Sequence, residues 1–227
     1  MVQSILIGVL VLVIVGVLIF SATAQRRLLK YYDKYSTKFV YCGLTGLELA
    51  KYFIYKNNLQ TKISFTEKRL GDFYSPKYDA IVLSKQTAST SNIASIAIAS
   101  HELGHAVQKQ QKMFLFRLSN FLRLFFYIGS FLVAPAIVAG IVFLFLPNKL
   151  SIGLTILIVC LSFIVFSYIT KILDVPIEFN ASKIAYNFLK ENNILDKTEL
   201  KQVKKMLKVA ANTYIASLFS GLLKLFK

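Results

Sequence analysis

The chain has 227 residues, of which 56% are hydrophobic, and its mean hydropathy is +0.57. It carries 27 Lys and Arg residues against 11 Asp and Glu residues, a formal charge of +16. A soluble domain needs only about 45–50% apolar residues, so this composition is not that of an ordinary cytosolic enzyme or a disordered chain. The two cysteines, Cys42 and Cys160, exclude a disulfide framework and a four-cysteine metal site.

The first apolar segment, Ile5–Ala24, has no charged residue and is long enough as a helix to cross about 30 Å of hydrocarbon. Basic residues follow it immediately, at Arg26, Arg27, Lys30, Lys34 and Lys38. This pattern predicts an uncleaved membrane anchor at residues 1–25, with its N-terminus outside and its basic flank in the cytoplasm. The small residues Ser21–Ala24 leave a cleavable signal as the alternative.

Residues 26–122 are more polar, and we expect them to form a small α+β domain. Leu44–Asn57 is predicted to be an amphipathic helix, with apolar residues at helical spacing at Leu44, Leu47, Ala50 and Ile54. Lys62–Thr66 and Ala80–Ser84 are β-branched and aromatic runs separated by turn residues, which favours a small hairpin or an edge strand. Ala80–Ser84 either offers an edge on which an extended peptide can pair or is simply a strand of a small sheet.

A long helix is predicted to start at Ile93 and to reach about Gln110, because apolar residues recur there at helical spacing. Ser91 or Asn92 precedes this helix, and the side chain of either can cap its first turn. Small and apolar residues on all sides indicate that the helix is largely buried.

Both histidines of the chain lie in this helix, in the sequence His101-Glu102-Leu103-Gly104-His105. Residues four apart lie on one face of a helix, so both imidazoles can bind one metal ion, with Glu102 beside the bound water. The alternative is a helix on which these side chains face solvent or satisfy one another. Burying two imidazoles and a carboxylate without a metal is costly, which favours the metal site.

Two further apolar segments, Leu124–Asn148 and Leu150–Thr170, are free of charged residues and meet at a short turn. We predict that residues 123–171 form a transmembrane helical hairpin. Lys and Arg residues flank the two ends of the hairpin, whereas its turn holds a single Lys. Both ends are therefore expected in the cytoplasm.

Residues 172–227 are predicted to form the C-terminal helices. Within them, Val209–Leu223 is apolar but short, so it either crosses the membrane or lies packed on the bundle or in the interface. The predicted fold class is a mainly α membrane protein with an anchor helix, a small α+β domain, a transmembrane hairpin and C-terminal helices. The basic charge belongs to segments that flank the membrane, and no nucleic-acid-binding motif is present in the sequence.

A catalytic zinc ion needs three protein ligands and a water molecule, and the sequence contains no third histidine. We predict that Glu178 is the third ligand, because it follows the last span and stands two residues after Pro176, a residue that often opens a helix. The alternative role for Glu178 is to stabilise the N-terminus of that helix. Asp174 is the reserve candidate for the third ligand.

The chain resembles the bacterial membrane zinc metallopeptidases of the YugP type, also called neutral zinc metallopeptidases. Besides the anchor, the resemblance rests on four blocks, at residues 71–76, 99–108, 175–182 and 210–214. The chain is more distantly similar to the HtpX gluzincins, whose third ligand is the Glu of an E-x-x-A-D segment. Glu178 and Ala181 match that segment, but Ser182 replaces the Asp that supports a histidine ligand.

The sequence therefore predicts a zinc metalloendopeptidase that is anchored in the bacterial plasma membrane, with its catalytic domain facing the cytoplasm. One Zn²⁺ per chain is expected on His101, His105 and Glu178, with Glu102 as general base. The oxyanion stabiliser has three candidates, Tyr74, Asn180 and Tyr214, but for each of them a purely structural role is the favoured alternative, so none is included among the catalytic residues. The expected partners are protein or peptide substrates, membrane proteins among them, and the lipid bilayer, but no nucleic acid.

Two other functions are weighed against this one. The first is a catalytically idle membrane adaptor with a structural zinc site, which needs a fourth protein ligand. The second is a transporter or channel component, which normally carries ionisable residues inside its spans, and the charge-free segments have none. Both are less favoured than the peptidase.

Overall fold

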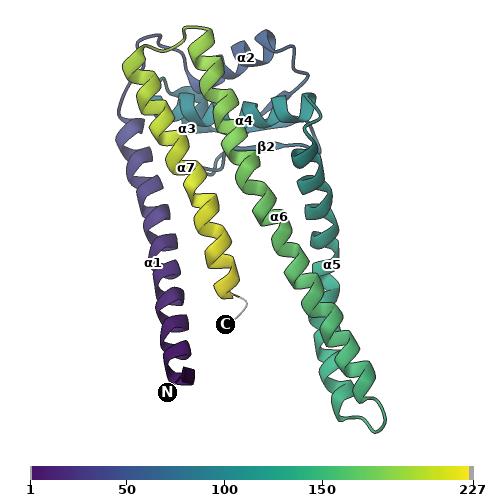
Figure 1. Cartoon of the computed structure of the whole chain (residues 1–227). Coiled ribbons are helices and arrows are strands. Elements are labelled where there is room, and N and C mark those ends of the chain that lie inside the picture. The colour runs from purple at the N-terminus through teal and green to yellow at the C-terminus, as the bar shows by residue number, and fades with distance from the viewer. Residues whose placement is uncertain (1, 225–227) are drawn as a thin grey trace. The chain divides into compact units, whose positions relative to one another are not determined.

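The computed structural model describes residues 2–224, except for the side chains of residues 2–15, 17, 18, 21, 128, 168 and 217–224. The described chain is mostly helical and includes one small sheet (Figure 1). Its elements, in chain order, are α1 (Val2–Ser36), α2 (Gly46–Lys56), β1 (Lys62–Thr66), β2 (Phe73–Ser75), β3 (Ala80–Ser84), α3 (Lys85–Ser89), α4 (Ile93–Gln110), α5 (Phe114–Phe145), α6 (Leu150–Glu191) and α7 (Lys197–Lys224).

The chain divides into two compact units. The first unit contains the residues up to Met113 and those from Val175 onward, and the second contains Phe114–Asp174. Helix α6 begins in the second unit and ends in the first. In the first unit α7 runs alongside α1, and α4 packs against α1, α2, α7 and the sheet (Figure 1). Helix α4 is therefore the central element of the unit that carries the H-E-x-x-H sequence.

The sheet has the strand order β1-β3-β2, so Ala80–Ser84 is its central strand. Strand β1 pairs with β3 in parallel, and β2 pairs with β3 antiparallel. Of the two alternatives for Ala80–Ser84, the structure shows a strand within a small sheet and not an edge that a peptide can pair with. Lys62–Thr66 is an edge strand, but the alternative of a hairpin between the two runs was wrong, because they pair in parallel. The short strand Phe73–Ser75 takes the hairpin position beside β3, which leaves β1 to pair with the opposite edge. Ile81 and Leu83 of β3 are fully buried, as expected of a central strand.

Helix α2 forms where the sequence predicts it, and Thr45 caps it. The Thr45 side chain accepts a hydrogen bond from the backbone N–H of Glu48, whose carboxylate accepts one from the Thr45 backbone N–H. The buried face differs from the predicted one, because it is formed by Leu49, Ala50 and Phe53. The Phe53 ring packs on Phe188 of α6, with ring centroids 4.0 Å apart, and this contact fixes which face turns inward.

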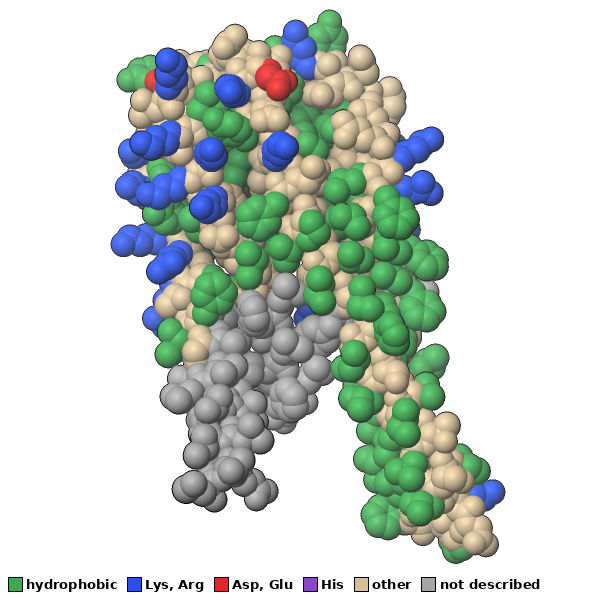
Figure 2. All heavy atoms as spheres, in the orientation of Figure 1, with side chains coloured by type: hydrophobic (Ala, Val, Ile, Leu, Met, Phe, Trp, Pro, Cys, Tyr) green, Lys and Arg blue, Asp and Glu red, His purple; other side chains and the backbone are tan. Residues whose placement is uncertain are grey.

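The second unit consists of α5 and the first part of α6. Helix α6 is long and apolar enough to cross a membrane. Helix α5 meets the same test only if its two halves, which meet at a 42° bend, count as one span. The surface of this unit is dominated by large hydrophobic side chains, as Figure 2 shows. Such a surface is typical of contact with lipid or with another protein. The predicted anchor, Ile5–Ala24, is helical within α1, but most of its side chains lie outside the described residues.

Helix α6 continues without interruption from Leu150 to Glu191 and contains Pro176 in its interior. The prediction that a new helix starts after Pro176 was therefore wrong. A proline inside a helix removes one backbone hydrogen bond, and packing on both sides can compensate for that loss. After the proline, Ile177, Ala181 and Ala185 are all buried, so this part of α6 is held in the first unit.

Candidate metal centre

Helix α4 supplies both histidines of the candidate site. Asn92 caps the helix by accepting a hydrogen bond from the backbone N–H of Ser95. His101 and His105 lie one turn apart on the same face, and each is only 9% exposed. Their rings meet edge to face, with centroids 5.0 Å apart. The pair is thus held in a fixed geometry with little contact with water.

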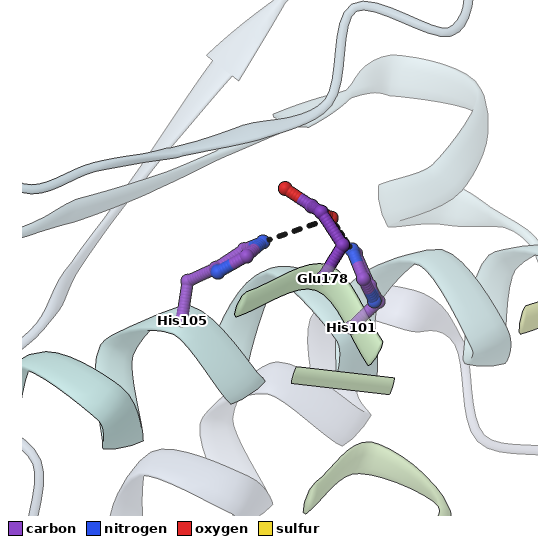
Figure 3. A group of neighbouring side chains, drawn as sticks. All are labelled: His101, His105 and Glu178. Carbon is purple, nitrogen blue, oxygen red and sulfur yellow. Dashed lines mark hydrogen bonds and ion pairs between the residues drawn. The ribbon is translucent and has the colours of Figure 1, made fainter. Parts of the chain in front are cut away.

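Glu178 reaches these histidines from α6, as Figure 3 shows. Its Oε2 atom lies 3.0 Å from Nε2 of His101 and 3.5 Å from Nε2 of His105. The potential ligand atoms of the three residues all lie within 4.8 Å of one another. Glu178 is also buried, with 8% of its surface exposed. The structure therefore brings together the three residues that the sequence predicts as metal ligands.

Gln108 holds His105 from the side opposite Glu178. The Oε1 atom of Gln108 lies 2.9 Å from Nδ1 of His105. The Nε2 atom of Gln108 donates hydrogen bonds to the Ile177 carbonyl and to Oδ1 of Asn180. Since an amide oxygen only accepts, this contact assigns the proton to Nδ1 of His105 and turns Nε2 toward Glu178. Gln108 is completely buried, so one side chain couples α4, α6 and the imidazole.

Ser182 contacts Nδ1 of His101, as Gln108 contacts Nδ1 of His105. Its hydroxyl oxygen lies 3.2 Å from Nδ1 of His101. Ser182 therefore contacts the ring nitrogen of His101 that does not face Glu178. A neutral hydroxyl polarises the ring less than a carboxylate does, but it still leaves Nε2 of His101 directed at Glu178.

Glu102 is positioned by the edge strand β2. Its Oε2 atom accepts a hydrogen bond of 2.9 Å from the backbone N–H of Tyr74. The side chain of Tyr74 points elsewhere, because its hydroxyl donates to Oδ1 of Asp79 at 2.6 Å. Thr61 and Lys109 also contact the Asp79 carboxylate. Tyr74 therefore contributes to the site through its backbone, and its hydroxyl is committed to a separate network.

The carboxylates and the imidazoles shift one another's pKa values. Burial raises the pKa of Glu102, although the two histidines oppose the shift. Burial alone would also raise the pKa of Glu178, but hydrogen bonds with His101 and His105 outweigh it and lower that pKa. Burial would lower the pKa of His105, yet its hydrogen bond and ion pair with Glu178 prevail and raise it. Without metal, the site therefore favours a protonated His105 paired with an ionised Glu178.

The remaining sequence candidates lie in different places. Asp174 belongs to the second unit, where it accepts hydrogen bonds from Ser119 and Arg123, and it is not one of the clustered ligand residues. Asn180 accepts a hydrogen bond from Gln108, and so belongs to the support of His105. Tyr214 lies in the wall of a cavity that His101 and Glu102 also line.

Two contributors were missed by reasoning from the sequence: the amide of Gln108 and the backbone N–H of Tyr74. Ser182 was singled out in the sequence, but its contact with His101 was not predicted. Gln108 follows His105 by three residues and His101 by seven, spacings that place it on the same face of the helix as the histidines. That spacing is a signal that could have identified it. The contact of the Tyr74 backbone N–H with Glu102 has no signal in the sequence, because it depends on the position of β2 beside α4.

The donor set fits a zinc ion. Two imidazole nitrogens and one carboxylate oxygen are the ligands of many catalytic zinc sites, which leave one position open for water. Calcium and magnesium prefer oxygen ligands alone, so this mixed set disfavours them. Within the residues that the structure describes, these three are the cluster of His, Cys, Asp and Glu side chains able to hold a metal ion.

Comparison with known proteins agrees with this geometry. A family model with the description "Putative neutral zinc metallopeptidase" matches residues 10–227. The chain is 28% identical over 207 residues to the "Putative membrane protease YugP" of Bacillus subtilis (strain 168), a match that covers 90% of this chain and 88% of that protein. No solved structure matches the chain.

Proposed function

The chain belongs to the neutral zinc metallopeptidase family, and on that premise we propose that it is a membrane-anchored zinc peptidase that hydrolyses peptide bonds. One observation carries the proposal: His101, His105 and Glu178 converge from α4 and α6 with both Nε2 atoms directed at one carboxylate oxygen. The Nδ1 atoms are engaged by Gln108 and Ser182, which is the arrangement expected of imidazoles that bind a metal through Nε2.

In this proposal His101, His105 and Glu178 hold one Zn²⁺ per chain. When bound, the ion supplies a Lewis acid that polarises the scissile carbonyl and lowers the pKa of a coordinated water. The chain's own contribution is to exclude solvent and to fix the ligands, since all three are at most 9% exposed. Their support by Gln108 and Ser182 keeps both rings in place while substrate binds.

Glu102 is the general base of the proposed reaction. It stands beside His101 but is not one of the three ligands, and the Tyr74 backbone N–H holds its carboxylate. Burial raises the pKa of Glu102 toward neutral pH, and a general base is most effective when its pKa lies near the pH at which the enzyme works. Glu102 takes a proton from the attacking water and passes it to the leaving amine, so that one water molecule is consumed for each bond cleaved.

Tyr214 is the candidate that we retain for stabilising the oxyanion. Unlike Asn180 and the side chain of Tyr74, it lines the same cavity as His101 and Glu102. A phenol hydroxyl near the scissile carbonyl can donate a hydrogen bond to the charge that develops on its oxygen.

We further propose that the protein is a multi-pass protein of the bacterial plasma membrane with its catalytic unit in the cytoplasm. One helix is apolar enough to cross a membrane, and the Bacillus subtilis relative is named as a membrane protease. The distribution of Lys and Arg in the sequence supports the orientation. Its substrates are proteins or peptides, membrane proteins among them.

The alternative, an adaptor with a structural zinc site, is less well supported. A closed site needs four protein ligands, and the cluster formed by the described residues offers three. A three-ligand site with a carboxylate beside it is better suited to hydrolysis.

Zinc content and peptidase activity of the detergent-purified protein test the proposal together. Glu178→Ala should lose zinc and activity, whereas Glu102→Gln should keep zinc and lose activity by roughly 10²–10⁴-fold, because a base and not a ligand is removed. Glu191→Ala, at an exposed position near the end of α6, is the control and should change neither quantity. Full zinc with unchanged hydrolysis in Glu102→Gln would refute the assigned mechanism.

A further inference from the structure

A cavity of about 220 Å³ opens beside the two reacting groups, since His101 and Glu102 form part of its wall. The rest of the wall comes from α1, α4, α7 and the loop between β1 and β2, all of which belong to the first unit. The proposed chemistry uses the part of the wall formed by His101, Glu102 and Tyr214, and it gives no role to the remaining, mainly apolar part. Its position next to the site raises the question of what it holds.

The wall of the cavity is mainly apolar. Leu28 of α1, Leu70 of the loop, Ile98 of α4 and Met206 of α7 all contribute to it. An engineered apolar cavity of about 150 Å³ is large enough to bind benzene, so this one can take an aromatic ring or a branched aliphatic side chain. Burial in such a space favours apolar groups by about 0.8 kcal/mol for each methylene removed from water, which is roughly fourfold in affinity.

The cavity is held open by contacts between its walls. Tyr32 of α1 is 2% exposed, and the guanidinium of Arg69 lies 5.2 Å from the centre of its ring. Arg69 also forms an ion pair of 2.8 Å with Asp33. On the far side of the loop, Oδ1 of Asp72 accepts a hydrogen bond of 2.7 Å from the backbone N–H of Ser84. The loop is thus tied both to α1 and to β3, and the space between them is preformed.

We propose that this cavity receives an apolar side chain of the substrate from a residue next to the scissile bond. The inference rests on the proposed function, since it names the substrates of that same site. The peptidase would accordingly cleave beside large aliphatic or aromatic residues. Helix α1, whose first part is the predicted anchor, then forms part of the specificity site, through Leu28 and Tyr32.

A basic side chain is the competing occupant, because two carboxylates line the cavity, those of Asp72 and Glu102. The structure argues against it. One oxygen of Asp72 is bound to Ser84, and the other is shielded from solvent without a partner among the described residues. Glu102 is held by the N–H of Tyr74 and is needed as the base. The unpartnered oxygen of Asp72 therefore offers no accessible surface to a cation in the cavity, and Glu102 is engaged by β2.

Two neighbouring positions of α7 provide a matched pair of variants. Ala210 lines the cavity, whereas Val209 lines a separate groove between α1 and α7. Ala210→Phe therefore fills the cavity, and Val209→Phe places the same ring on the same helix outside it. Leu28→Ala widens the cavity from α1, where the half-buried leucine can be shortened with little risk to folding.

The test uses two readouts. Casein is digested and the residues beside each cleaved bond are identified by mass spectrometry. Separately, the dissociation constants of two peptide hydroxamates that differ only in an isobutyl or a methyl side chain are measured on the zinc-loaded protein. We expect wild type and Val209→Phe to cleave beside large apolar residues and to bind the isobutyl compound at least tenfold more tightly. Ala210→Phe should lose both preferences, and Leu28→Ala should shift them toward larger rings.

Three results would overturn the proposed specificity site without contradicting the proposed peptidase activity. They are equal binding of the two hydroxamates to wild type, a side-chain preference that persists in Ala210→Phe, and cleavage beside Lys and Arg. The converse result is that wild type cleaves no peptide bond and still binds the isobutyl hydroxamate more tightly than the methyl one, with the preference lost in Ala210→Phe. That result would support the cavity as a binding site for apolar side chains and refute the proposed function. If Ala210→Phe fails to fold, the shift in Leu28→Ala decides, and its absence counts against the cavity.

Discussion

Gly104 of α4 lies directly against the backbone of Ala181 on α6. A Cβ atom added at Gly104 would stand 2.5 Å from the carbonyl oxygen of Ala181, closer than any ordinary contact. The two helices can therefore cross at this distance only because residue 104 has no side chain. The crossing lies one turn of α6 from Glu178, and it sets how far that carboxylate reaches toward His101.

Gly104→Ala should consequently weaken zinc binding, although every ligand is still present. The added methyl group must push α6 away from α4, and a carboxylate displaced by about 1 Å no longer completes the site. We expect substoichiometric zinc after purification, measured by plasma mass spectrometry. Gly16→Ala is the control, because nothing lies within 4 Å of a Cβ at that exposed position of α1. Full zinc occupancy in Gly104→Ala would show that the helix crossing does not set the site.

The two residues that support the imidazoles should differ in importance. Gln108 joins His105 to the Ile177 carbonyl and to Asn180 in a completely buried position, so Gln108→Ala removes three contacts at once. Zinc affinity should fall by roughly 10–100-fold, as is usual when a group supporting a metal ligand is lost. Ser182→Ala removes one contact of 3.2 Å and should cost less.

Competition with a chromogenic chelator measures both affinities. Ser182→Asp is the informative companion variant, since it places a carboxylate beside Nδ1 of His101. We expect it to bind zinc at least as tightly as wild type, because a carboxylate polarises the ring of His101 more strongly. If Ser182→Ala proved more damaging than Gln108→Ala, the assignment of Gln108 as the main support would be wrong.

Much of this site could be predicted from the sequence because its signals are local. The spacing of His101 and His105 fixes their common face, and Asn92 marks the start of their helix. Glu178 was predicted for a partly incorrect reason, since Pro176 does not open a new helix and Glu178 lies in the interior of α6. The carboxylate reaches the histidines because α6 crosses α4 at Gly104, a relationship between distant segments that spacing alone does not contain.

In the sheet, likewise, the features that depend on neighbouring residues could be predicted, whereas the pairing of distant segments could not. The bounds of β1 and β3 agree with their predicted ranges, because β-branched runs between turn residues are a local signal. Their parallel pairing depends on β2, a strand of three residues that is too short to show a pattern. Strand β2 also supplies the Tyr74 N–H that holds Glu102, so missing the strand meant missing that contact.

Labelling of cysteines in intact cells tests the proposed orientation. Cys42 is exposed and lies in the catalytic unit, whereas Cys160 is buried. A membrane-impermeant maleimide should label Cys42 only after the cells are permeabilised, because the proposed orientation, which follows from the basic flanking segments, places this unit in the cytoplasm. In a Cys42→Ser background, Asn148→Cys at the hairpin turn should be labelled in intact cells. Reporters fused near Gln60 and Asn148 should agree, and the reverse pattern would overturn the orientation.

The metal-free protein should lose stability as the pH rises above neutrality. Pairing with Glu178 raises the pKa of His105 from 6.5 to about 9, so its stabilising contribution is complete below about pH 6.5 and is lost as the pH rises through 9. The pKa of Glu178 falls from 4.5 to about 2, so its contribution is complete above about pH 4.5 and is lost as the pH falls through 2. The pair therefore stabilises the metal-free protein most between about pH 4.5 and 6.5.

Zinc binding should follow the opposite trend, because the metal takes the place of the proton on Nε2 of His105. We expect the melting temperature of the chelator-treated protein to fall between pH 6.5 and 9, while the increase that added zinc produces grows over the same range. Thermal scanning at a series of pH values measures both. Glu178→Gln is the matched control: it removes the charge that raises the pKa of His105, so its metal-free melting temperature should fall less over this interval. If wild type and Glu178→Gln showed the same pH dependence, the His105–Glu178 ion pair would not be the source of the trend.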